Sequence, residues 1–182
     1  RGVASGDANL YLRNVLWLIE HKGALRTLEN WMQTLFPGFW IDISFDPKKD
    51  TVIQVLVSVE GRGVRSFPLE LAGTGLLQAL QIFSYVTLFE PKLLLLDEPD
   101  AHLHPDNQTT LASVLQTVVN QTDTRILIST HSRHLVDALH DSARMIWLKD
   151  GGVQEEGHGL ERVSLLMDLG ALDDYDKLGA GG

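Results

Sequence analysis

An apolar run of four leucines that ends in two carboxylates, residues 93–98, limits most strongly how this chain can fold. A run this short, followed by Pro99, is typical of a strand buried on both faces of a parallel sheet. Ligands gather at the carboxyl ends of such strands. One carboxylate of such a pair can hold a hard cation such as Mg²⁺, and its neighbour can act as general base on a water molecule. The alternative is a buried strand that ends in an ordinary acidic turn.

A second apolar run, Arg125–Ser129, is followed by His131, which stands 33 positions after Glu98. The gap fits one crossover helix, predicted over 106–120, so the two strand ends should lie side by side. At that edge His131 could contact a phosphate, and the alternative is a histidine that caps the following helix. A third strand of the same sheet is predicted over 145–148.

Gly73, Thr74 and Gly75 open a helix that is predicted to run to about Phe89. Glycines let backbone N–H groups approach a phosphate, and a helix N-terminus carries partial positive charge. A lone Gly-x-Gly also occurs in simple tight turns, so this pattern is weak by itself.

The first seventy residues have a different character. Apolar residues recur with helical spacing over 9–22 and 25–36, and Pro37 and Gly38 end the second helix. The spacing then changes to two, which predicts an antiparallel meander of strands over 40–45, 51–60 and 64–69.

Composition excludes several classes of protein. Apolar residues make up 44% and charged residues 21% of the 182 residues, which is typical of a globular chain with a core. No apolar run approaches the roughly 18 residues of a membrane span, and the chain has no cysteine for disulfides or thiolate metal sites. Residues 150–182 hold 8 acidic and 2 basic residues, so they carry −6 of the net charge of −9. No basic stripe typical of a DNA-binding module is present. We expect a cytoplasmic protein without a membrane partner.

Together these motifs resemble the C-terminal half of an ABC-type ATPase domain. Asp97 and Glu98 match the Walker B pair, His131 matches the switch histidine, and 71–75 matches the signature motif. The stretch 98–105 reads Glu-Pro-Asp-Ala-His-Leu-His-Pro and resembles the Glu-Pro-Glu-Ala-His-Leu-His-Pro of SMC-like ATPases of the overcoming-lysogenisation-defect (OLD) family. The likeness covers about 9–150.

The resemblance implies an α/β fold with a mostly parallel sheet, flanking helices and a small antiparallel meander. It also implies a homodimer that encloses ATP and Mg²⁺. The implied cofactor-binding residues are Gly73, Thr74 and Gly75 at the signature and Asp100, His102 and His104 in the D-loop. The implied catalytic residues are Glu98, which polarises the attacking water, and His131, which holds the γ-phosphate, and the implied Mg²⁺ ligand is Asp97. Such relatives carry a TOPRIM nuclease or pair with a separate one, and many act on DNA or in defence against phage.

Two departures leave alternatives open. The signature lacks a serine before its glycine, so Thr74 would supply the hydroxyl. No Gly-x4-Gly-Lys-Ser/Thr phosphate loop (Walker A) occurs, and none of the six lysines has that frame, so we expect this loop to precede Arg1 or to come from another chain. A degenerate ATPase fold that serves as a scaffold and a transporter-type nucleotide-binding domain remain alternatives.

Four segments are predicted: helices over 1–37, the meander over 38–70, the ATPase core over 71–150, and an acidic connector over 151–182 that leads to a further domain.

A zinc site on paired histidines, His102 with His104 or His131 with His134, is a minor alternative, because a position in the D-loop explains the first pair without metal.

Overall fold

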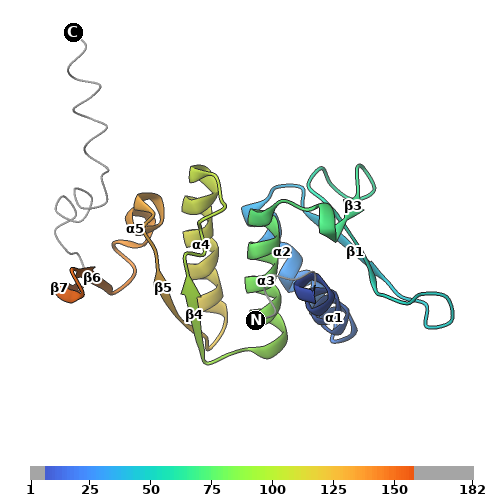
Figure 1. The fold of residues 1–182 in the computed structure, drawn as a ribbon, viewed down its shortest axis with the longest axis horizontal. Coiled ribbons are helices and arrows are strands. Elements are labelled where there is room, and N and C mark those ends of the chain that lie inside the picture. The colour runs from blue at the N-terminus through green and yellow to red at the C-terminus, as the bar shows by residue number, and fades with distance from the viewer. Residues whose placement is uncertain (1–6, 158–182) are drawn as a thin grey trace, which may run out of the picture.

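The structure is a computed structural model that describes residues 7–157, and it combines helices with short strands (Figure 1). The elements in chain order are α1 (Asp7–His21), α2 (Leu25–Leu35), β1 (Trp40–Ser44), β2 (Gln54–Ser58), β3 (Phe67–Pro68), the 3-10 turn η1 (Leu69–Leu71), α3 (Thr74–Phe89), β4 (Leu93–Asp97), α4 (Pro105–Gln121), β5 (Arg125–Ser129), α5 (Arg133–Leu139), β6 (Met145–Lys149) and β7 (Gly152–Gly157).

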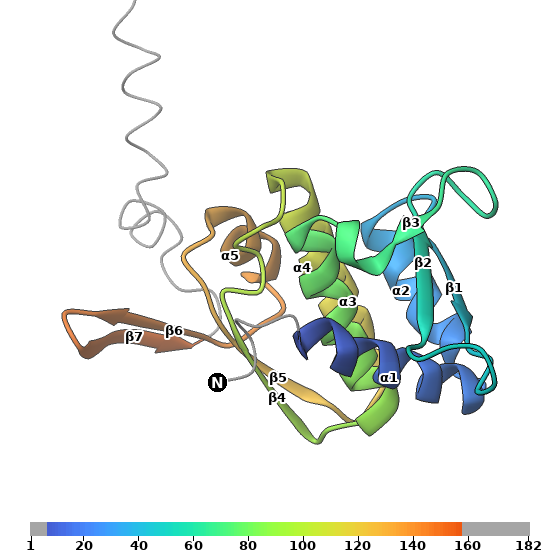
Figure 2. The ribbon, with the colours of Figure 1, turned by 45° about the vertical axis from the view of Figure 1, so that its right-hand side comes forward.

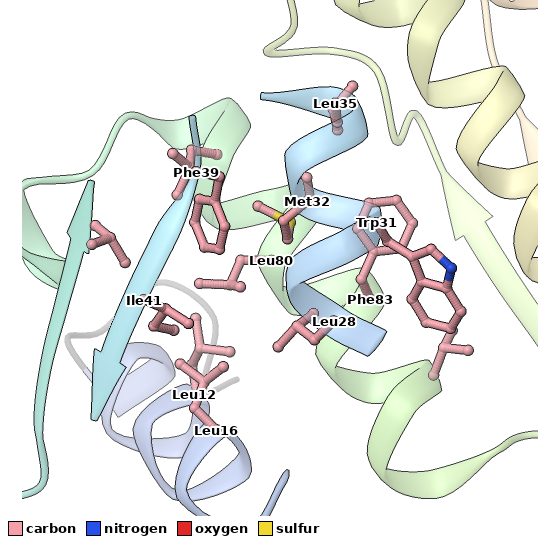
Figure 3. Packing of buried hydrophobic residues seen from close by; sticks show 14 of the residues in the cluster. Leu12, Leu16, Leu28, Trp31, Met32, Leu35, Phe39, Ile41, Leu80 and Phe83 are labelled. Carbon is pink, nitrogen blue, oxygen red and sulfur yellow. The ribbon is translucent and has the colours of Figure 1, made fainter. Parts of the chain in front are cut away.

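The two predicted N-terminal helices are present and bury the predicted faces. Figure 3 shows side chains of α1, α2, β1 and α3 packed together, with Leu16, Met32 and Phe83 all fully buried. The same cluster of apolar side chains extends to Val118 in α4. The helices, the meander and the first part of the predicted ATPase core therefore share one hydrophobic core.

The meander forms as predicted in type, although its strands are shorter. β1 pairs antiparallel with β2, and β2 pairs with β3 over only two residue pairs. The strand predicted over 64–69 is mostly a loop, because Pro68 has no N–H to extend a ladder and the chain turns into η1. At Gly38, with φ +84°, a Cβ atom would lie 2.7 Å from the carbonyl oxygen of Val59, so the turn into β1 needs glycine.

The predicted crossover is also present. β4 and β5 pair in parallel, with Leu94 opposite Ile126 and Asp97 opposite Ser129, and α4 connects them (Figure 2). The prediction that both faces of these strands are buried is wrong for the described residues. Leu94 is buried, whereas the outward-facing Leu95 is 66% exposed, because the helices cover only one face of the pair.

The strand predicted over 145–148 forms, but it is not a third strand of the parallel sheet. β6 pairs antiparallel with β7, and within residues 7–157 it does not pair with β4 or β5 in a sheet. Asp150 and Gly151 both have positive φ, 52° and 76°, which is the geometry of a two-residue type I′ hairpin turn. The hairpin projects from the rest of the fold in Figure 2. The helix predicted over 161–169 lies outside the described residues.

Glu29, on the core side of α2, is a buried carboxyl that no sequence pattern indicated. Glu29 is 9% exposed, and its side-chain oxygen Oε1 has no hydrogen-bond partner in the described part of the chain. Burial raises its pKa above the ordinary value, against smaller opposing effects from a backbone hydrogen bond at Ile41 and from Arg62 and Arg26.

We expect the free energy of unfolding to fall as pH rises from about 4.5 towards neutrality because of Glu29. A carboxyl with a raised native pKa keeps its proton in the folded state while the unfolded chain loses it, so deprotonation favours unfolding. Glu29→Gln should remove this part of the pH dependence and raise stability at pH 7, measured by urea unfolding between pH 4.5 and pH 7.5. Parallel pH profiles for the two proteins would contradict the assignment.

None of the helices that the structure describes is long and apolar enough to cross a lipid bilayer.

Candidate functional site

The carboxyl ends of β4 and β5 bring the predicted Walker B residues beside polar groups of the next strand. Asp97 lies opposite Ser129 in the ladder, and the Ser129 hydroxyl donates a hydrogen bond to Asp97 Oδ1. The N–H of Glu98 donates to the carbonyl oxygen of Ser129 at 2.9 Å. Parallel pairing in this register therefore places both carboxylates at one edge of the sheet.

His131 lies directly beside Glu98, which confirms the predicted proximity of the two residues. Its Nε2 is 3.4 Å from Glu98 Oε1, and its backbone N–H donates to Glu98 Oε2 at 3.4 Å. The His131 side chain is 90% exposed and that of Glu98 35% exposed. A water molecule or a phosphate oxygen can therefore reach both groups, which is the arrangement needed for attack on a phosphoryl group.

Asp100 lies inside the loop that follows β4 rather than on its surface. The residue is 2% exposed, and its Oδ1 accepts a hydrogen bond from the Thr130 hydroxyl at 2.8 Å. The same hydroxyl accepts from the N–H of Ser132 at 3.0 Å. Gln108 adds a second connection, donating to the carbonyl oxygen of Asp100 at 3.2 Å and accepting from the Ser132 hydroxyl at 2.8 Å. This placement favours a role for Asp100 in holding the two loops together over the direct nucleotide contact that the sequence analysis predicted.

The two histidines of the same loop are exposed on its surface. The His104 ring accepts a hydrogen bond from the N–H of Asp106 at 3.4 Å and so caps the start of α4. Leu103, between the histidines, is buried and anchors the loop. Within 7–157 no group of three or more potential ligand side chains could hold a metal ion, so the zinc alternative has no support from geometry.

The helix that follows the Gly73 motif begins as predicted. Gly73 is the N-cap of α3, no side chain caps this end, and the first turn holds no acidic residue. Gly73 and Thr74 are exposed, and a Cβ atom at Gly73 would meet nothing within 4 Å. These two residues are free to approach a phosphate.

Gly75 requires a correction, because it was predicted to face an incoming nucleotide on a partner subunit. The residue is buried within its own chain, where a Cβ atom would lie 2.5 Å from the carbonyl oxygen of His102 and 2.9 Å from Leu103 Cδ2. Glycine is needed here because α3 packs directly on the backbone of the 98–105 loop.

Two polar residues that no sequence pattern indicated, Gln78 and Gln108, support this edge. The side chain of Gln78 donates to the carbonyl oxygen of Glu98, and Gln108 bonds both loops, as described above. A glutamine on a helix has no characteristic spacing, so the only signal available was a polar residue on an otherwise apolar helix face.

The opposite edge of the strand pair has a shallow hollow lined by Lys92, Val119, Asp123 and Arg125. The Asp123 pKa lies below its ordinary value, because Lys92 donates a hydrogen bond to its carboxylate at 2.9 Å. Both side chains are largely exposed, so the pair contributes little to stability. Nothing in this hollow matches the chemistry of the carboxyl edge.

Comparison with known families decides the class. The model of the AAA ATPase domain family matches residues 24–136, which is most of the described chain. The chain belongs to the AAA ATPase domain family. The family match includes the Gly73 motif, Asp97, Glu98 and His131.

Two similar curated proteins are ATP-binding proteins, one named for cell division and one for methionine import. The cell division ATP-binding protein FtsE of Streptococcus pneumoniae is 37% identical over 97 residues, which cover 53% of this chain and 40% of FtsE. The methionine import ATP-binding protein MetN 2 of Oceanobacillus iheyensis is 30% identical over 129 residues, covering 68% of this chain and 36% of MetN 2. The chain thus spans less than half the length of these two relatives.

Solved SMC heads share the fold. An SMC ATPase structure from work on ATP-driven dimerization and DNA-stimulated activation has a TM-score of 0.59 at 15% identity and covers 80% of this chain and 94% of its own. The Smc head domain of Pyrococcus yayanosii has a TM-score of 0.58 at 17% identity and covers 85% of this chain and 31% of its own. The predicted fold class, an ABC-type α/β ATPase fold, is confirmed.

Proposed function

We propose that the edge formed by the ends of β4 and β5 binds Mg²⁺-ATP and hydrolyses it. The observation that carries this proposal is the side-chain contact of 3.4 Å between His131 and Glu98, directly after Asp97, at the carboxyl ends of two parallel strands. A general base beside a polarising imidazole suits attack of water on a terminal phosphate. A scaffold without activity would not need this set.

The residues at the edge fit a magnesium ion. The Asp97 carboxylate is exposed and stands beside the Ser129 hydroxyl, and both offer the oxygen donors that Mg²⁺ prefers. When bound, the ion would neutralise charge that develops on the transferred phosphoryl group. Glu98 would take a proton from the attacking water, and His131 would donate a hydrogen bond to the γ-phosphate.

The phosphate-binding loop is proposed to come from sequence outside these 182 residues. The face of the strand pair turned away from α3 and α4 exposes Leu93, Leu95 and Leu127, at 57%, 66% and 57% of their surface. Three large apolar side chains side by side on a sheet favour coverage by another layer. The chain also spans less than half of its curated relatives. The remainder of the ATPase domain is the proposed cover.

Dimerisation around ATP is the second part of the proposal. The exposed start of α3 at Gly73 and Thr74 presents unpaired N–H groups and the positive end of a helix, which suit a phosphate carried by a second subunit. His102 and His104, exposed on the neighbouring loop, would lie at the seam. The solved structure of an SMC ATPase with the same fold comes from work on ATP-driven dimerization. This similarity supports a homodimer here.

The process that the ATPase drives is proposed from the stretch 101–105, Ala-His-Leu-His-Pro. This stretch favours an SMC-like ATPase related to the OLD family, which controls a nuclease or another effector on DNA, in anti-phage defence or DNA processing, in the cytoplasm. The curated similarity to FtsE and MetN 2 supports a second candidate, a transporter-type nucleotide-binding domain. A transporter would require a membrane partner, so co-purification of a membrane subunit would favour the second candidate.

Asp97→Ala in the full-length protein is expected to lower Mg²⁺-dependent ATP turnover at least about 100-fold, because metal ions contribute several kcal/mol to phosphoryl transfer. Chelation of Mg²⁺ should abolish turnover in the parent protein. Asp123→Ala, at the opposite edge, is the matched control and should keep activity. Comparable phosphate release by Asp97→Ala and Asp123→Ala would exclude Asp97 as the metal ligand.

A further inference from the structure

Gln78, in the second turn of α3, contacts the backbone of the proposed catalytic base. Its Nε2 donates a hydrogen bond to the carbonyl oxygen of Glu98 at 3.1 Å, and the side chain is partly buried. The other amide atom, Oε1, is buried and has no partner within the described residues. The Glu98 carbonyl therefore determines the orientation of the amide, because a flipped amide would bring two oxygens together.

Glu98 has a backbone conformation that needs support. Its φ of +46° lies in the left-handed region, which costs a non-glycine residue of order 1–3 kcal/mol. Three hydrogen bonds hold it: its N–H donates to Ser129, and its carbonyl oxygen accepts from the N–H of Ala101 at 3.2 Å and from Gln78. In this conformation the Glu98 carboxylate points to His131.

We propose that Gln78 is a positioning residue that holds Glu98 in its catalytic conformation and connects it to the start of α3. The proposal rests on the function proposed for Glu98. Gln78 and Gly75 are three positions apart and so lie on one face of α3, and both contact the 98–105 loop, Gly75 through the carbonyl oxygen of His102. A shift of α3, caused by a phosphate at Gly73 and Thr74, would therefore move the backbone of Glu98 in the same subunit.

Through this contact the proposed dimerisation would control hydrolysis. Each Glu98 should be placed for attack only when the α3 start of its own chain is engaged. Among the described side chains of α3, Gln78 bonds the Glu98 backbone, so together with the packing at Gly75 it can transmit engagement to the base.

Gln78→Met removes the donor at similar size and is expected to lower kcat at least about 10-fold, because small displacements of a catalytic group are costly. The KM for ATP should change less than about 2-fold, since the side chain of Gln78 bonds the Glu98 backbone and not the exposed Gly73 or Thr74. Gln81→Met, at an exposed position on the next turn, is the matched control and should match the parent protein.

Gln78→Glu provides a test that a purely structural role would not pass. An ionised carboxylate cannot donate to the Glu98 carbonyl, whereas a protonated one can. The kcat deficit of this variant relative to the parent should therefore shrink as pH falls from 8 to 5.5. A deficit independent of pH would contradict a role as donor.

Hydrogen exchange of the 97–103 segment in the nucleotide-free, full-length protein tests the contact without catalysis. Gln78→Met should exchange faster there, and Gln81→Met should not. Unchanged exchange, or unchanged kcat alongside a Glu98→Gln variant that is inactive, would overturn the proposal. Normal turnover by Glu98→Gln would instead refute the proposed function, and hydrogen exchange would then decide the positioning role alone.

Discussion

Glu98→Gln in the full-length protein is expected to lower ATP turnover at least about 100-fold while ATP still binds, which is the usual scale for loss of a general base. Glutamine keeps the size of the side chain and its position beside His131 at the ends of β4 and β5. It cannot accept the proton of the attacking water. The loss should therefore be in kcat and not in KM for ATP.

The same variant should accumulate the closed, ATP-bound dimer because hydrolysis no longer reopens it. Light scattering with and without Mg²⁺-ATP measures this change, and steady-state phosphate release measures turnover. Glu60→Gln, at an exposed position after β2, is the matched control. Near-parental turnover in Glu98→Gln would mean that another group activates the water.

Gly75→Ala is expected to lower the free energy of unfolding by about 1–3 kcal/mol, the usual cost of an atom forced into a packed interior. The added Cβ would lie 2.5 Å from the backbone oxygen of His102, which cannot move without displacing the 98–105 loop. Because that loop carries Glu98, ATP turnover should also fall. Urea unfolding and phosphate release measure the two effects.

Gly73→Ala is the matched control for this prediction. The residue lies two positions earlier with ordinary extended backbone, φ −63° and ψ 150°, and open space where the Cβ would stand. Its unfolding free energy should change by less than about 1 kcal/mol, because the loss of a glycine N-cap is partly offset by the lower backbone entropy of alanine in the unfolded chain. Equal stabilities of Gly75→Ala and Gly73→Ala would contradict the packing of α3 on the loop.

The parts of the fold that the sequence predicted well are those with strong local patterns. Helical spacing located α1 and α2, and a short apolar run with polar ends located β4 and β5. Parallel pairing then followed from the crossover length, and it correctly placed His131 beside Glu98. Glu98 and His131 therefore lie side by side because of the order of the strands, and this order can be predicted from local sequence patterns.

The parts that were missed depend on contacts between segments far apart in the sequence. An apolar run such as 93–96 does not show whether one or both strand faces are covered. The position of β6 was assigned from its apolarity, although the Asp150-Gly151 pair in fact makes a hairpin turn. The burial of Gly75 and Asp100 and the bond from Gln78 follow from how α3 meets the loop after β4, which no spacing rule encodes.

In the proposed mechanism, ATP is hydrolysed where Asp97, Glu98 and His131 meet. A crystal structure of the full-length Glu98→Gln protein with Mg²⁺-ATP tests it most directly. The γ-phosphate should lie within hydrogen-bond reach of His131, with the metal ion next to Asp97 and the start of α3 from a second subunit on the opposite side of the nucleotide. A nucleotide bound elsewhere, with no phosphate near His131, would contradict the account.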